Sequence, residues 1–175
     1  MAYLAIGARA LLTVVFLVSA SSKLRSGAAY ADFAASVRAF RLLPERAVGP
    51  VAALVTAVEC CVPVLVWVPA TAVAGTLLAV VLLAFLTAAV WLVVRRGSRP
   101  VCRCFGPSGQ PIGVIHVARN LVLLAVAAVS LAGGAVSAAG GLVAVSAGVV
   151  GALTVVKLDG IGFLFTRPGP TNPAS

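Results

Sequence analysis

Long apolar stretches dominate the chain, and five of them have the length of a transmembrane helix. Such a helix needs about 20 mostly apolar residues, because the hydrocarbon core of a bilayer is roughly 30 Å thick. The stretches cover about residues 3–20, 50–69, 71–94, 112–131 and 138–156, and only 132–137 separates the last two. We therefore predict an all-α integral membrane protein. It should form a single domain over 1–165, with an antiparallel four-helix transmembrane bundle and a fifth transmembrane helix.

A shorter amphipathic segment lies between the first two apolar stretches. Its apolar side chains recur at helical spacing, at Tyr30, Phe33, Val37 and Phe40. This pattern predicts an interfacial helix at about 28–43, ended by Pro44, that lies in the membrane surface or caps the bundle. At the other end of the chain, 166–175 is rich in Pro, Gly, Asn and Thr, and we predict a disordered tail there.

The composition excludes several classes of protein. Hydrophobic residues make up 62% of the chain and charged residues 10%, against roughly 45–50% and about 25% in soluble domains. With a mean hydropathy of +1.15, the chain has too few polar side chains to cover a water-facing surface. A soluble enzyme, a disordered chain and a disulfide-stapled secreted module are all excluded.

The basic residues give the chain its net charge of +9, and their positions predict its orientation. Five lie in 21–47, four in 95–111 and two after the fifth stretch, whereas the connections at 69–71 and 132–137 contain none. Basic connections stay in the cytoplasm, so we expect a multi-pass protein of the cell (plasma) membrane. Its N-terminus would be outside, and the loops 21–47 and 95–111 and the C-terminus would be cytoplasmic. We expect anionic membrane lipid, and no nucleic acid, to be the partner of these charges.

The first stretch also has the features of a cleaved signal peptide, with Val18-Ser19-Ala20 as the cleavage site. Cleavage would leave the basic segment 21–47 outside the cell, so we predict a retained helix. In the fifth stretch, small residues at four-residue spacing allow close helix packing. They pack within the bundle or form a homodimer interface: Gly140, Ala144, Gly148 and Ala152.

Two cysteines form a Cys-x-Cys motif after the third stretch. Only Arg103 separates Cys102 from Cys104, and a disulfide across one residue is strained and exchanges readily. The charge of Arg103 would favour the reactive thiolate. We interpret these three residues as a catalytic thiol–disulfide site. The alternatives are two unreactive thiols or half of a metal site; because His116 is the only histidine, we predict no metal.

Charged side chains inside the membrane cost several kcal/mol unless they are paired, so they indicate function. Glu59 lies near the middle of the second stretch, Arg119 lies within the fourth and Arg9 lies within the first; either arginine could reach Glu59, or Arg9 extends outward to the membrane surface. We expect a buried polar pair that positions the cysteine loop or moves protons, or else a structural ion pair. The adjacent Cys60 and Cys61 are either small buried hydrophobes or a relay that receives a disulfide from the loop.

Several short motifs stand out together: Lys23-Leu24, Phe40-Arg41-Leu42-Leu43-Pro44, Glu59, Cys102-x-Cys104-Phe105-Gly106 and Arg119-Asn120. They resemble the MauE methylamine-utilisation family, which belongs to the DoxX-like small membrane proteins. The resemblance covers about residues 3–132 and leaves the fifth helix outside. The Cys-x-Cys-Phe-Gly element is its specific part, although this chain has Arg103 where the family usually has a glycine.

The resemblance implies a role in maturing the small subunit of methylamine dehydrogenase, an exported, disulfide-rich client, together with a thioredoxin-like partner. A more distant resemblance to vitamin K epoxide reductase and quinone-linked disulfide-forming proteins implies a quinone as cofactor. An exported client conflicts with a cytoplasmic Cys-x-Cys. Either electrons cross through Cys60 or Cys61, or the topology is inverted, or the thiols meet an inner partner.

Three functions remain open from the sequence. The first is a thiol–disulfide oxidoreductase that uses Cys102 and Cys104. The second is a non-catalytic membrane chaperone or scaffold in which the 21–47 helix docks the partner. The third is a DoxX-like carrier of a quinone or another small molecule, with Glu59 and Arg119 lining the site.

Overall fold

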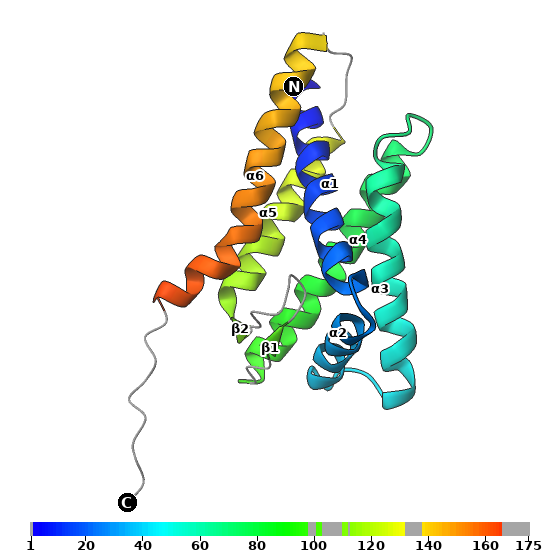
Figure 1. Cartoon of the computed structure of the whole chain (residues 1–175), viewed down its shortest axis with the longest axis vertical. Coiled ribbons are helices and arrows are strands. Elements are labelled where there is room, and N and C mark those ends of the chain that lie inside the picture. Colours follow the sequence, from blue (N-terminus) through cyan, green and yellow to red (C-terminus); the bar gives the residue numbers. More distant parts are fainter. Residues whose placement is uncertain (1, 98–100, 103–109, 112, 132–137, 166–175) are drawn as a thin grey trace, which may run out of the picture.

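The computed structural model describes residues 2–97, 101–102, 110–111, 113–131 and 138–165, with the backbone alone for 101–102, 110–111, 138–139 and 157–165. In these ranges the chain forms six helices and one pair of two-residue strands (Figure 1). The helices are α1 (Ala2–Leu24), α2 (Gly27–Ala39), α3 (Glu45–Leu65), α4 (Ala72–Arg95), α5 (Val114–Ser130) and α6 (Ala138–Phe165). The strands β1 (Val101–Cys102) and β2 (Gln110–Pro111) pair antiparallel between α4 and α5. The predicted all-α class is confirmed, apart from this short hairpin.

In the part of the chain that the structure describes, three helices are long and apolar enough to cross a membrane: α1, α3 and α4. Among the described residues, α5 and the segment Gly140–Val156 of α6 are shorter apolar helices. Large apolar side chains remain exposed along the outside of the bundle, as Leu54, Val64, Val81, Leu142 and Val143 show. Extensive exposed apolar surface is rare on soluble monomers. We conclude that this is a membrane protein whose outer surface faces lipid.

The first helix is longer than its apolar stretch. It was predicted to end near residue 20 and continues to Leu24, through a polar stretch that includes Ser22 and Lys23. These side chains bond back to the previous turn: Ser22 Oγ donates to the Ser19 carbonyl oxygen at 2.7 Å, and Lys23 Nζ donates to the same oxygen at 3.3 Å. The polar last turn is therefore part of the helix and not of the following connection.

The interfacial helix α2 is shorter than the predicted 28–43. Ser26 caps its N-terminus, because its Oγ accepts a hydrogen bond from the Ala29 amide at 3.1 Å. The helix ends at Ala39 because Arg41 adopts a left-handed backbone conformation with φ 51°. Pro44 does not end α2 but precedes α3, which begins at Glu45 instead of residue 50. α2 packs against α1 and α3 and therefore closes one end of the bundle.

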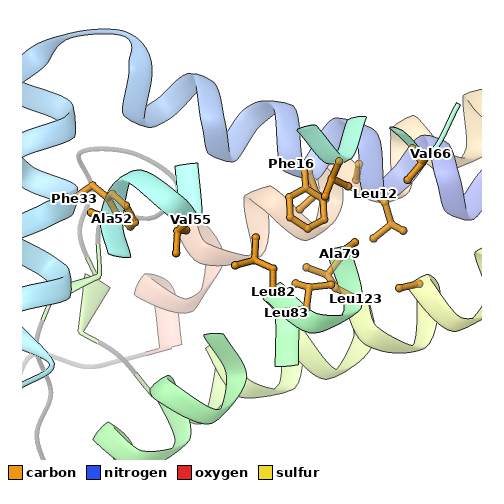
Figure 2. Close-up of a cluster of buried hydrophobic side chains, with 14 residues drawn as sticks. Leu12, Phe16, Phe33, Ala52, Val55, Val66, Ala79, Leu82, Leu83 and Leu123 are labelled. Carbon is orange, nitrogen blue, oxygen red and sulfur yellow. The ribbon is translucent and has the colours of Figure 1, made fainter. Parts of the chain in front are cut away.

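The bundle is organised around α1, which contacts α2, α3, α5 and α6. Further helix contacts join α2 to α3, α3 to α4 and α4 to α5. The core lies between these helices (Figure 2) and contains buried side chains from all six, including Leu12, Phe16, Val55, Leu83 and Leu123. Close packing of α3 and α4 depends on Gly75, since a Cβ there would lie 2.6 Å from the Leu65 Cβ.

Helix α6 runs alongside α1 (Figure 1), and its small residues form the contact. A Cβ on Gly7 of α1 would lie 3.0 Å from the Ala144 carbonyl oxygen, and a Cβ on Gly148 would lie closer still to the Gly7 carbonyl oxygen. Ala144 and Ala152 are buried. The predicted small-residue stripe therefore packs within the chain, against α1. The helix is longer than the predicted 138–156, and the predicted tail 166–175 lies outside the described residues.

Candidate functional site

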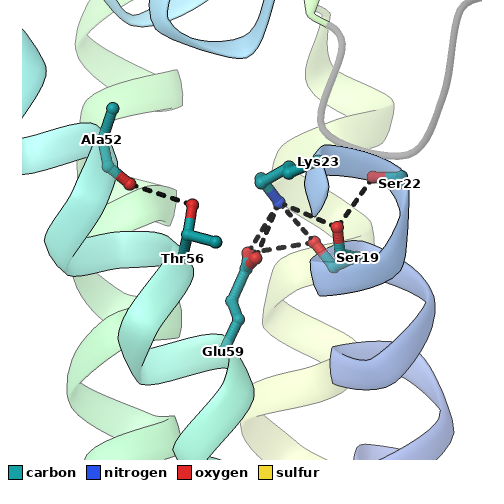
Figure 3. A network of polar contacts seen from close by, with 6 residues as sticks. All are labelled: Ser19, Ser22, Lys23, Ala52, Thr56 and Glu59. Carbon is teal, nitrogen blue, oxygen red and sulfur yellow. Dashed lines mark hydrogen bonds and ion pairs between the residues drawn. The ribbon is translucent and has the colours of Figure 1, made fainter. Parts of the chain in front are cut away.

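A buried ion pair joins α1 to α3 near the end of the bundle that α2 closes. Lys23 Nζ lies 2.7 Å from Oε2 and 2.9 Å from Oε1 of Glu59 (Figure 3). The two side chains are 1% and 4% exposed. A buried carboxylate and a buried ammonium neutralise each other here. Each would be costly alone in an apolar environment.

Ser19 joins the pair into a three-residue network. It lies one helical turn before Lys23, so both side chains are on the same face of α1. Lys23 Nζ donates to Ser19 Oγ at 2.7 Å, and Ser19 Oγ in turn donates to Glu59 Oε1 at 2.9 Å. The hydroxyl thus accepts from the cation and donates to the anion, which fixes the geometry of both partners.

Phe33 of α2 covers the cation. Its ring centroid lies 4.7 Å from Lys23 Nζ, within the range in which an ammonium is attracted to the negative face of an aromatic ring. Phe33 is buried although it belongs to the interfacial helix. The contact gives α2 a specific role, since it seals the ion pair from the end of the bundle.

The local backbone of α3 is also unusual at this site. Pro63 lies inside the helix, four residues after Glu59. A proline has no amide proton, so the helical hydrogen bond to the Glu59 carbonyl oxygen cannot form. Glu59 therefore carries both a charged side chain and a carbonyl oxygen without its helical partner.

A small cavity of about 50 Å³ adjoins the ion pair. Its polar wall residues are Ser19, Glu59, Arg119 and Asn120, and the apolar remainder includes Phe33. Side chains from α1 to α5 form these walls. The site is therefore built by five helices.

The structure gives Glu59 a different ion-pair partner from the one predicted. The sequence indicated Arg119, whereas the carboxylate of Glu59 pairs with Lys23. Arg119 lies in the wall of the adjoining cavity. Sequence reasoning noted Lys23 and Phe33 but did not assign them or Ser19 to the site, because it placed Lys23 in the basic connection. The spacing of four between Ser19 and Lys23, continuing the phase of α1, is the signal that would have identified them.

Among the described residues, Cys60 and Cys61 take no part in this network. Cys60 and Cys61 are exposed and unpaired on α3, which contradicts the prediction that they are buried. Their role as a relay stays a prediction. Cys102 ends β1, and its backbone pairs with Gln110. Arg103 and Cys104 lie outside the described residues, so the predicted catalytic geometry stays a prediction.

Comparison with known proteins gives the family. The family described as "Methylamine utilisation protein MauE" matches residues 1–133, which contain the whole network and the hairpin. The chain is 38% identical over 121 residues to "Methylamine utilization protein MauE" of Paracoccus denitrificans. That match covers 68% of this chain and 63% of the relative, so the chain spans less than two thirds of the relative's length. No solved structure matches. The match over most of its length shows that this chain belongs to the MauE family.

Proposed function

We propose that this protein acts in methylamine utilisation as a membrane component that matures an exported, disulfide-containing client through thiol–disulfide exchange with a thioredoxin-like partner. The match to the MauE family carries the proposal, because it includes both the ion-pair network and the Cys102–Cys104 motif. Methylamine dehydrogenase small subunit is the client that the family resemblance indicates.

The proposed reaction exchanges two thiols for one disulfide. The thiolate of Cys102 or Cys104 attacks a disulfide sulfur of the partner and forms a mixed disulfide. The second cysteine then attacks this bond, so the partner leaves as a dithiol and the Cys102–Cys104 disulfide forms. Two electrons and two protons pass to the partner, and a separate dithiol donor must reduce the Cys102–Cys104 disulfide before the next exchange. The charge of Arg103 favours the thiolate that begins each exchange.

We propose that the end of the bundle that carries α2 and the hairpin is cytoplasmic. α2 contacts β1, and exposed arginines surround this end: Arg25, Arg38, Arg41, Arg46, Arg95 and Arg96. Basic residues at one end of a helical bundle are retained on the cytoplasmic side. The partner of the cysteine pair would then act from that side. The exposed positions of Cys60 and Cys61 support this arrangement over an electron path through the bundle.

A pair of double variants tests the exchange. Cys102→Ser with Cys104→Ser should abolish client maturation, measured by alkylating and counting the free thiols of the client in cells grown on methylamine. Cys60→Ser with Cys61→Ser is the matched control and should leave maturation unchanged. Normal maturation with the first double variant would contradict the exchange and support a non-catalytic scaffold.

Labelling with a membrane-impermeant maleimide tests the orientation. In intact cells, Cys102 and Cys104 should resist the reagent, and in inverted vesicles they should react after reduction. Labelling in intact cells would show the opposite topology.

The second candidate is a carrier of a quinone or another small molecule, which needs more room than the cavity of about 50 Å³ beside Glu59 provides. In this case Glu59→Gln would impair function more than loss of Cys102 and Cys104, and a quinone chromophore would remain with the protein through purification. The exchange proposal predicts the opposite order of effects.

A further inference from the structure

Asn120 is a buried amide whose hydrogen bonds the protein does not supply. Its side chain belongs to α5 and the residue is 5% exposed. Among the residues that the structure describes, none forms a hydrogen bond with this side chain. A carboxamide has two N–H donors and an acceptor oxygen. Buried polar groups are nearly always satisfied, so a further hydrogen-bonding group is required here.

The Asn120 side chain lines the cavity of about 50 Å³ beside the ion pair. Ser19 of α1 and Glu59 of α3 contribute polar groups to the same cavity. Apolar side chains, among them Phe16 and Leu123, form most of the remaining wall. A group that satisfies Asn120 in this space therefore lies close to the carboxylate.

Glu59 has an acceptor site left for such a group. An ionised carboxylate offers about four lone-pair sites. Oε1 accepts from Ser19 and Lys23, and Oε2 accepts from Lys23. One site on Oε2 therefore remains for a donor from the cavity.

We propose that this cavity binds ordered water, which joins the Asn120 amide to the Glu59 carboxylate. One water occupies about 30 Å³, so the cavity has room for one or two. A water molecule donates to Glu59 while it accepts from, or donates to, the Asn120 amide, and it thus satisfies both groups. Buried water typically makes two to four such bonds to otherwise unsatisfied polar groups.

The water makes Asn120 a positioning residue for Glu59. It extends the network of α1 and α3 to α5, which begins shortly after the hairpin that contains Cys102. This inference does not depend on thiol exchange.

Solid-state NMR in lipid bilayers tests the inference, because the chain has two asparagines, Asn120 and Asn172. With ¹⁵N-asparagine and an Asn172→Ser background, the remaining side-chain amide signal belongs to Asn120. We expect magnetisation transfer from water protons to this amide. Transfer from lipid acyl protons alone, or no transfer from water, would overturn the proposal.

A cavity-filling variant distinguishes transfer from water inside the cavity from transfer from water elsewhere. Val55 lines the cavity, so Val55→Leu should abolish or strongly reduce the transfer. Val62, two turns further along α3, is buried outside the cavity wall, and Val62→Leu is the matched control that should retain the signal. Full transfer in Val55→Leu would contradict the proposed site. The Cys102→Ser, Cys104→Ser variant should also retain the signal. The cavity water can therefore be tested separately from the proposed thiol–disulfide exchange.

Discussion

Lys23 Nζ and Glu59 Oε2 lie 2.7 Å apart, although 36 residues separate them in the chain, and both side chains are almost fully buried. The contact requires α1 to continue beyond its apolar stretch, so that Lys23 enters the bundle. It also requires α3 to present Glu59 inward. The ion pair therefore forms only when α1 extends as far as Lys23 and α3 is rotated so that Glu59 faces the interior.

Removal of one partner of this pair should be much worse than removal of both. Lys23→Met or Glu59→Leu alone leaves an unpaired buried charge, and we expect each to lower the free energy of unfolding by about 3–5 kcal/mol. The double variant should lose far less than the sum of the two single effects. Reversible unfolding in mixed detergent micelles measures this double-mutant cycle.

The exposed pair Arg38–Glu45 is the matched control for that cycle. Its N–O distance is 2.8 Å, but its side chains are 57% and 73% exposed. Solvent screening limits such pairs to about 0–1 kcal/mol. Equal coupling energies for the two pairs would contradict the conclusion that burial strengthens the Lys23–Glu59 coupling.

The Phe33 ring should stabilise the protein through the Lys23 ammonium. Phe33→Leu removes the cation–π contact, and we expect a coupling energy of about 0.5–2 kcal/mol between Phe33 and Lys23. The measurement compares Phe33→Leu in the wild-type and Lys23→Met backgrounds. Phe16→Leu, at another buried aromatic of the core, should cost the same in both backgrounds.

The apolar pattern predicted the number and order of the helices because a bilayer requires long apolar segments. The ends of the helices were predicted less well where polar side chains continue a helix. The last turn of α1 is an example, since Lys23 is stabilised there by Glu59 of α3. Partners that are distant in the chain leave no signal in local hydropathy.

The local pattern also did not reveal which residues pair with each other in the candidate site. Glu59 was identified because a carboxylate interrupts an apolar stretch, and Arg119 was identified for the equivalent reason. Which cation approaches the carboxylate depends on helix rotation and tilt, which the apolar pattern leaves open. The exposure of Cys60 and Cys61 is a consequence of the same rotation, because burying Glu59 turns the next two residues outward.

The contact between α1 and α6 should be sensitive to one methyl group. A Cβ at Gly148 would collide with the Gly7 carbonyl oxygen, which belongs to the backbone and cannot move aside easily. We expect Gly148→Ala to destabilise the protein by about 1–3 kcal/mol through overpacking. A Cβ at Gly151 meets only the end of the Leu11 side chain, at 3.2 Å. Gly151→Ala should therefore cost much less in the same unfolding assay, and equal effects would contradict the packing described.

Cys60 and Cys61 should react from the lipid side of the bundle. Both are exposed on α3, a helix with the length and composition of a membrane span. In a Cys102→Ser, Cys104→Ser background, an apolar maleimide that partitions into the bilayer should label them without denaturant. A Cys60→Ser, Cys61→Ser, Val62→Cys variant in this background is the control, because Val62 is fully buried and its replacement should stay unlabelled until the protein unfolds. Mass spectrometry counts the adducts. Protection of both native cysteines in folded protein would place them inside the bundle and restore the relay as a route for electrons.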